Sequence, residues 1–141
     1  MIITARAYNL PISRKHSVEV ARFIKGKKLK EALRILEEII ELKTPVKLTK
    51  HHRGVAHKKK IGPGRYPVKV AKYIKKVLLS AKSNGKNKNI DEEKLDNSLI
   101  FVEANKGQTL YHGGRKIGRK RKATHIFVKL LVEEDKRGDN Q

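Results

Sequence analysis

The residues in this sequence that are best suited to chemistry are cations, and most of them lie in two stretches that contain no carboxylate. Residues 42–90 hold 15 Lys or Arg and no Asp or Glu, and residues 104–132 hold eight and none. Together these stretches carry 23 of the 35 basic residues, whereas the whole chain has 14 acidic ones. An ordinary solvated surface mixes both signs of charge. The two stretches therefore indicate that the protein binds a polyanion.

The composition of the stretches favours folded RNA as that polyanion. Arginine can pair two amino groups with one phosphate and stack on an unpaired base, and glycine lets the backbone approach a sugar-phosphate chain closely. Both residue types occur among lysines in 110–124 (LYHGGRKIGRKRKAT) and in 45–65, which shows no sustained hydrophobic period. Neither segment has the apolar content for a core of its own. We expect a loop and an arm that are completed by RNA.

Metal and redox chemistry are not predicted. His51, His52 and His57 lie beside Arg53 and the lysines at 58–60, whose positive charge opposes a bound cation. The chain has no cysteine, so thiolate zinc sites and disulfides are excluded. We predict no metal and no cofactor.

Catalysis is not predicted either. His125 has no Ser or carboxylate partner nearby in the sequence. The turn Gly62–Arg65 (GPGR) lacks the Lys-Ser pair of a nucleotide-binding loop. The carboxylates of Glu37, Glu38 and Glu41 fit the polar side of a helix. The sequence predicts a binding protein that is not an enzyme and has no catalytic residues.

Hydrophobic periodicity indicates one strand and three helices before residue 90. A period of two predicts a strand over Ile2–Tyr8. The helices are predicted after an N-cap at Ser13 until Gly26, from Lys27 until Thr44, and from Pro67 until Gly85. The predicted shared core consists of Val20, Ile24, Leu33, Leu36, Ile40, Ile74, Val77 and Leu78.

The third predicted helix carries five lysines and no acid, so their counter-charge must come from outside that helix. These are Lys69, Lys72, Lys75, Lys76 and Lys82. Residues 84–89 (NGKNKN) predict a polar turn, followed by one helical turn over 91–96.

Two β-rich runs, Leu99–Val102 and Ile126–Val132, flank the second acid-free stretch. We predict that they pair as an extended antiparallel hairpin over 98–132, with a basic tip at about 107–123. With a basic loop over 44–66, the chain is expected to form a single domain over 1–141.

Four segments then carry a resemblance to a known family. They are Ile61–Gly85 (IGPGRYPVKVAKYIKKVLLSAKSNG), Leu10–Leu33, His51–Lys60 (HHRGVAHKKK) and Thr124–Glu134 (THIFVKLLVEE). In order and spacing they resemble the universal large-subunit ribosomal protein numbered twenty-two in bacteria and seventeen in eukaryotes, in its archaeal form. The resemblance implies an α+β fold in which three helices pack on a small antiparallel sheet and a long β-hairpin protrudes. The periodicity agrees.

The resemblance also implies a function: a structural constituent of the large ribosomal subunit, cytoplasmic, that organises large-subunit rRNA and contributes its hairpin to the polypeptide exit tunnel. Expected partners are rRNA, neighbouring ribosomal proteins and the nascent polypeptide. The tip residues expected nearest the tunnel are Arg115, Gly118 and Arg119. The expected rRNA contacts are the basic residues Arg14, Lys15, Lys50, His51, His52, Arg53, His57, Lys58, Lys59, Lys60, Arg65, Lys69, Lys72, Lys76, Arg115, Lys116, Arg119, Lys120, Arg121 and Lys122.

Two other classes of protein fit the charge less well. A DNA-binding or chromatin protein is the main rival, but no helix-turn-helix or basic-zipper pattern appears. A membrane-surface protein would need large apolar residues on the lysine helix, and the chain has no tryptophan. No run approaches the roughly 20 apolar residues that span a bilayer. We therefore expect neither DNA nor a membrane as partner.

Overall fold

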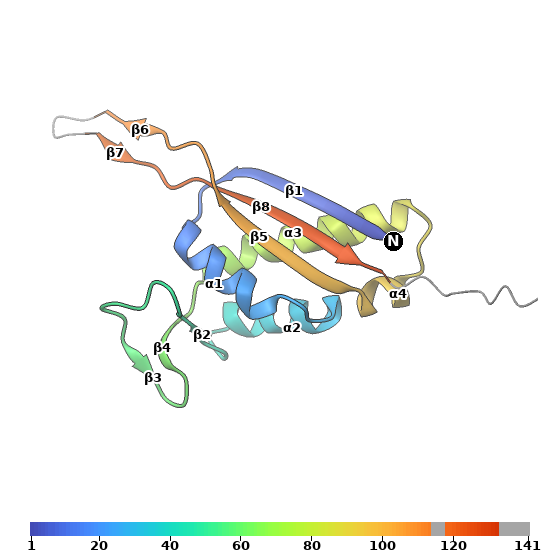
Figure 1. Ribbon diagram of the computed structural model, residues 1–141, viewed down its shortest axis with the longest axis horizontal. Coiled ribbons are helices and arrows are strands. Elements are labelled where there is room, and N and C mark those ends of the chain that lie inside the picture. Colours follow the sequence, from blue (N-terminus) through green and yellow to red (C-terminus); the bar gives the residue numbers. More distant parts are fainter. Residues whose placement is uncertain (114–117, 133–141) are drawn as a thin grey trace, which may run out of the picture.

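The computed structural model describes residues 1–113 and 118–132, and its main sheet has three antiparallel strands (Figure 1). Strand β8 (Thr124–Leu131) lies in the centre, between β1 (Ile2–Leu10) and β5 (Leu99–Lys106). Together with the helices, this sheet confirms the predicted α+β class. Both outer strands are longer than the sequence pattern predicted, because pairing with β8 continues to Leu10 in β1 and to Lys106 in β5.

The sheet buries one face, as the period of two in its strands requires. Ile3 of β1 pairs with Leu130 of β8, which pairs on its other side with Ile100 of β5, and all three are fully buried. Residues one position along point to the opposite face, which no described helix covers.

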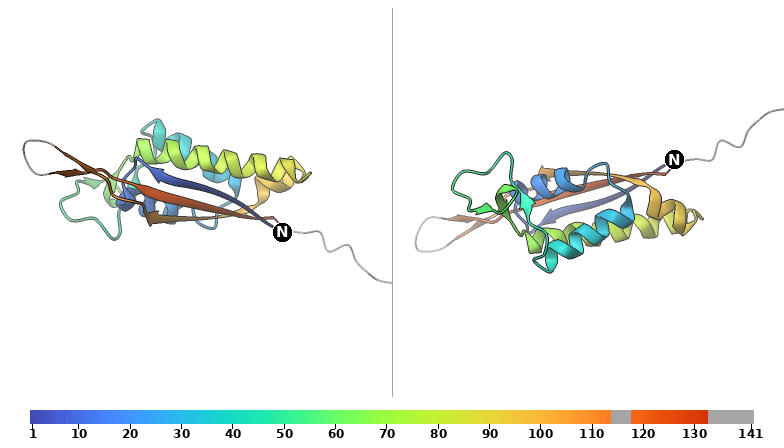
Figure 2. Two further views of the ribbon diagram at one scale, coloured as in Figure 1. Left: turned by 90° about the horizontal axis from the view of Figure 1, so that it is seen from above. Right: turned by 90° about the horizontal axis from the view of Figure 1, so that it is seen from below.

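Three helices cover the buried face: α1 (Arg14–Ile24), α2 (Leu29–Ile40) and α3 (Val68–Asn87). In the view from above, α3 runs along one side of the strands (Figure 2). None of the described helices is long and apolar enough to cross a bilayer.

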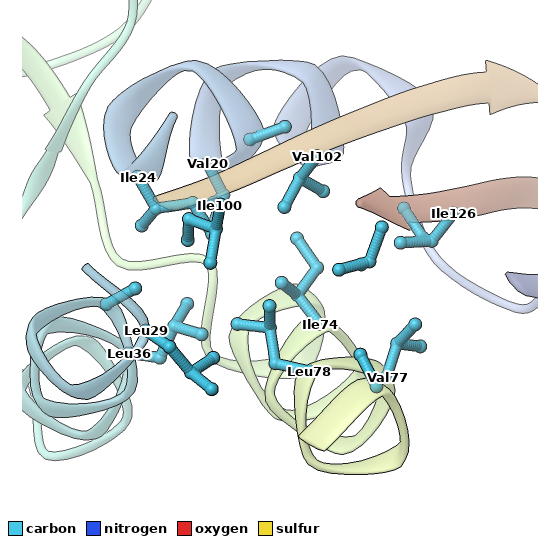
Figure 3. Packing of buried hydrophobic residues seen from close by; sticks show 14 of the residues in the cluster. Val20, Ile24, Leu29, Leu36, Ile74, Val77, Leu78, Ile100, Val102 and Ile126 are labelled. Atoms are coloured by element: carbon cyan, nitrogen blue, oxygen red, sulfur yellow. The ribbon is translucent and has the colours of Figure 1, made fainter. Parts of the chain in front are cut away.

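The core lies where the three helices meet the sheet (Figure 3). Six of the eight predicted core residues are buried: Val20, Ile24, Leu36, Ile74, Val77 and Leu78. The prediction was wrong for Leu33 and Ile40, which are only partly buried at the edge of the cluster. Helix α2 is rotated so that its stripe of Leu29, Ala32, Ile35, Leu36 and Ile39 faces inward.

Two predicted helix ends were wrong. Helix α2 stops at Ile40, and Leu42 then turns the chain with a φ of 60°. Helix α3 continues through Gly85 to Asn87, so the turn predicted at 84–89 begins later. Gly85 is buried beneath Leu95, and an added Cβ would lie 2.9 Å from Ile3 Cδ1. Glycine stands there because β1 and the short helix α4 (Glu92–Asn97) approach α3 closely.

The first basic segment is more ordered than a simple loop. It forms a small sheet in which β4 (Gly62–Arg65) lies between β2 (Val46–Lys47) and β3 (His57–Lys58). In the second basic segment, β6 (Tyr111–His112) pairs with β7 (Arg119–Lys120), and the pair extends away from the body (Figure 1). We call residues 107–123 the arm. Residues 114–117, which include the predicted contacts Arg115 and Lys116, lie outside the described residues. The predicted bounds of the domain, loop and hairpin remain predictions.

Candidate nucleic-acid interface

Cations from four separate segments gather around one depression, which we call the basic groove. They come from the start of α1, the loop after β2, strand β4 and the link between β7 and β8. The lining residues are Ser13, Lys15, His16, Lys50, His51, His52, Arg53, Val55, Arg65 and Lys122. None of them is acidic. An adjoining depression shares Ser13, His16, Arg65 and Lys122 and extends the groove to Lys69, at the start of α3.

A buried carboxylate on α1 holds the loop after β2 in place. Glu19 is 2% exposed, and its two oxygens accept hydrogen bonds from the Lys50 amide (2.7 Å) and the Thr49 hydroxyl (2.9 Å). Arg22 donates to the same hydroxyl. Burial raises the pKa of the Glu19 carboxyl, but these hydrogen bonds outweigh burial and hold the pKa below its ordinary value. The Glu19 carboxylate is thus hydrogen-bonded inside the protein and does not lie among the cations of the groove.

A second hydrogen bond brings the base of the arm to the groove. Thr124, the first residue of β8, is fully buried, and its hydroxyl donates to the Ile12 carbonyl at 2.8 Å. Because Ile12 lies two residues before α1, this bond places Lys122 beside the start of that helix. Two segments more than 100 residues apart in the sequence therefore form one surface.

The pKa of His16 reflects the positive charge of the groove. The pKa of its imidazole lies below the ordinary value, first because of burial and then because Arg65, Lys122 and His51 repel a further positive charge. His16 was not predicted from the sequence as part of the site. Its position four residues before the buried Val20, at the edge of the apolar stripe of α1, was the available signal.

The predicted contact residues divide among several places. Seven line the groove: Lys15, Lys50, His51, His52, Arg53, Arg65 and Lys122. Arg14 is exposed at the start of α1, and residues 57–60 lie at β3 and the turn after it, apart from the groove lining. Gly118, Arg119, Lys120 and Arg121 are exposed on the arm. Whether any of these residues touches RNA remains a prediction.

The lysines of α3 also divide into two sets. Lys75 pairs with Glu37 of α2 at 2.8 Å, and Lys82 pairs with Glu92 (2.8 Å) and Asp96 (2.6 Å) of α4. Their counter-charge thus comes from neighbouring helices. Within the described part of the chain, no carboxylate pairs with the set Lys69, Lys72 and Lys76. Nor do the described residues contain three His, Cys, Asp or Glu placed to hold a metal ion.

By fold and charge distribution, the chain falls in the class of small basic α+β proteins with a cationic groove and arm. The sequence pattern of the family described as ribosomal protein L22p/L17e matches residues 5–130. The chain therefore belongs to that ribosomal protein family.

Three archaeal relatives agree with the chain over most of their length. The large ribosomal subunit protein uL22 of Methanocaldococcus jannaschii is 42% identical, across 93% of this chain and 88% of its own length. That of Archaeoglobus fulgidus is 40% identical, across 92% and 83%. That of Ignicoccus hospitalis is 37% identical, across 93% and 88%. The predicted resemblance is confirmed.

Proposed function

We propose that this protein is a non-enzymatic structural constituent of the large ribosomal subunit in the cytoplasm, where it binds large-subunit rRNA and neighbouring ribosomal proteins. The observation that supports this most is the basic groove, in which cations from four segments converge with no acid among the lining residues. Such a surface repels itself unless a polyanion fills it. Membership in a ribosomal protein family supports rRNA as that polyanion.

Phosphate contacts position the protein in this proposal, and RNA shape specifies the place. Arg53 and Arg65 can each present a planar fork to a phosphate, whereas Lys15, Lys50 and Lys122 act as point charges. Every neutralised phosphate releases condensed counterions, so binding weakens steeply as salt rises.

The test is binding to a large-subunit rRNA fragment by wild type, the Arg65→Glu variant and the Lys30→Glu variant. Lys30 is exposed on α2 and does not line the groove, so Lys30→Glu controls for the same change in net charge. We expect Arg65→Glu to weaken binding and flatten its salt dependence far more than Lys30→Glu. In the wild type, RNA binding should also raise the pKa of His16, measured by NMR. Equal losses in both variants would contradict a role for the groove.

We also propose that the arm contributes to the wall of the exit tunnel and meets the nascent polypeptide. Its strands carry the β5–β8 pairing outward, and the Arg121 amide donates to the Leu110 carbonyl at 2.7 Å. The exposed cations of β7 and the link after it then have a rigid support at their base. The family resemblance supports the exit tunnel as the place where these cations lie.

Replacing residues 111–120 with Asn-Gly tests the arm separately. The bond from Arg121 to Leu110 would then close a two-residue turn, and Asn-Gly accepts the positive φ angles that such a turn needs. We expect incorporation into subunits to survive. Nascent-chain stalling, or sensitivity to small molecules that lodge in the tunnel, should change. If incorporation fails while the variant still folds, the arm is an assembly clamp instead.

A further inference from the structure

The uncovered face of the main sheet carries three aromatic rings in contact, which we call the aromatic platform. The Tyr8 ring lies 5.3 Å from the His125 ring and 5.7 Å from the Phe127 ring, centroid to centroid. The interplanar angles are 71° and 81°, so Tyr8 stands edge-on to both neighbours. His125 and Phe127 come from the central strand and Tyr8 from β1.

Hydrogen bonds hold the platform in shape before any ligand arrives. The backbone N–H of Asn9 donates to His125 Nδ1 at 3.0 Å, which fixes the orientation of that ring. In the neutral imidazole, the proton is then carried by Nε2. Asn9 adopts a φ of 50° to reach this position. The side-chain oxygen of Asn9 accepts from the backbone N–H of Gln108 at 3.1 Å, so the platform lies where the arm leaves the sheet.

Packing between strands does not account for the whole arrangement. Cross-strand aromatic contacts stabilise a sheet, and they leave His125 and Phe127 half-buried. Tyr8, however, remains 57% exposed, although its ring contacts both of the others. An aromatic surface of this kind, open and rigid, is what a flat ligand stacks on.

The charges beside the platform indicate which flat ligand fits. A shallow depression next to Phe127 is lined by Thr4, Arg6, Glu103, Phe127, Val128 and Lys129. The Arg6 guanidinium lies 5.9 Å from the Phe127 ring centroid. Arg6 and Lys129 can pair with phosphate, whereas Glu103 repels phosphate but accepts hydrogen bonds from a base amino group. One nucleotide with an unpaired base offers a phosphate to the two cations and an amino group to Glu103. The outer surface of a duplex offers phosphate alone.

We propose that the aromatic platform is a second RNA site, which stacks one unpaired base of a single-stranded segment on Tyr8 while Arg6 and Lys129 receive its phosphate. This inference rests on the proposed binding of rRNA. It adds a site on the opposite face of the sheet from the helices, and a mode of recognition that lysines alone do not provide.

Tryptophan fluorescence can test the platform directly, because the chain contains no Trp. The Tyr8→Trp variant places one reporter on the platform, and the Leu79→Trp variant places one on α3, at a residue that is also exposed (44%). The probes are single-stranded oligoadenylate and an RNA duplex of equal charge, with binding followed in parallel by anisotropy of labelled RNA. We expect oligoadenylate to quench the Tyr8→Trp reporter and the duplex to leave it unchanged. Bound RNA without quenching, or equal quenching by both RNAs, would overturn the proposal.

Affinity for an rRNA fragment provides the second measurement. Tyr8→Ala should weaken binding by about five- to a hundredfold, the usual effect of removing one stacking ring, and Tyr8→Phe should bind as wild type does. Circular dichroism checks that both variants fold. If wild type binds the fragment and Tyr8→Ala binds equally well, the platform is not a base site and the proposed function stands. If wild type does not bind large-subunit rRNA at all, the proposed function itself fails.

Discussion

The two ends of helix α3 use the same residue type in opposite ways. Towards its C-terminus, Lys82 and Lys86 bond to carboxylates of α4 at 2.6–3.0 Å. Towards its N-terminus, Lys69, Lys72 and Lys76 are exposed, and Lys69 borders the basic groove. We call these the paired end and the open end. A lysine-rich helix is therefore not one uniform cationic surface, because neighbouring acids decide which lysines are paired.

The paired end is held mainly by burial. Leu95 of α4 is fully buried against Gly85, whereas the Glu92 side chain is 57% exposed. Ion pairs at such exposure contribute little to stability. The open end has the opposite requirement, because its cations repel one another until a polyanion arrives. Four sets of substitutions test this difference between the two ends.

Leu36→Ala should have the largest effect on stability, and it should affect both ends. Leu36 is fully buried in the core that all three helices share, so the substitution should lower the free energy of unfolding by about 2–5 kcal/mol. Thermal or urea unfolding measures the loss. A negligible change would show that the ends do not depend on one core.

Reversing the open end should strongly impair RNA binding with little effect on the fold. In the triple variant Lys69→Glu, Lys72→Glu, Lys76→Glu, the slope of log affinity against log salt should fall by about two to three. The matched control is the triple variant Lys28→Glu, Lys30→Glu, Lys88→Glu, at exposed lysines that do not line the groove, which makes the same change in net charge. An unfolded triple variant in circular dichroism would mean that these lysines are structural.

Glu19→Gln should loosen the loop that supplies the groove. Removing the charge from this buried acceptor should cost about 1–3 kcal/mol. Because the folded pKa of Glu19 lies below its ordinary value of 4.5, the stabilisation is complete above that pH and is lost as the pH falls through the folded pKa. Unfolding measured against pH should therefore show a smaller acid loss in Glu19→Gln than in wild type. Identical profiles would remove Glu19 as the anchor.

Asp96→Asn at the paired end should have the smallest effect. It removes one of the two partners of Lys82 and leaves the pair with Glu92, so the loss of stability should be about 1 kcal/mol. Affinity for rRNA should not fall, because the groove is untouched. A marked loss of binding would show that the paired end also meets RNA.

Much of the fold was predictable because periodicity reports burial directly. The alternation in β1 and the stripes of α1 and α3 each reflect one face against the core. The end of α3 was not predictable from local signals. Gly85 and its polar neighbours favour a turn, but packing of Leu95 and Ile3 against Gly85 outweighs that preference.

The candidate site was predictable in composition but not in arrangement. Acid-free stretches identified the cations, yet no local pattern shows that Lys122 lies beside His16 or that Glu19 holds Lys50. Those contacts depend on the bond from Thr124 to Ile12 and on the packing of α1. For the same reason, Lys75 and Lys82 could not be separated from Lys69 and Lys72 by sequence alone.

The order of strands in the main sheet determines when the sheet can form during translation. Strand β8 is the last of the three to leave the ribosome that makes this chain, yet it lies between β1 and β5, which do not pair with each other. Until β8 emerges, neither neighbour has its partner, and the groove lacks Lys122. Closing such long loops is slow. Most of the groove cations are therefore translated before the groove itself can form. Until β8 is in place, the nascent chain has to be kept from non-specific contact with nucleic acid.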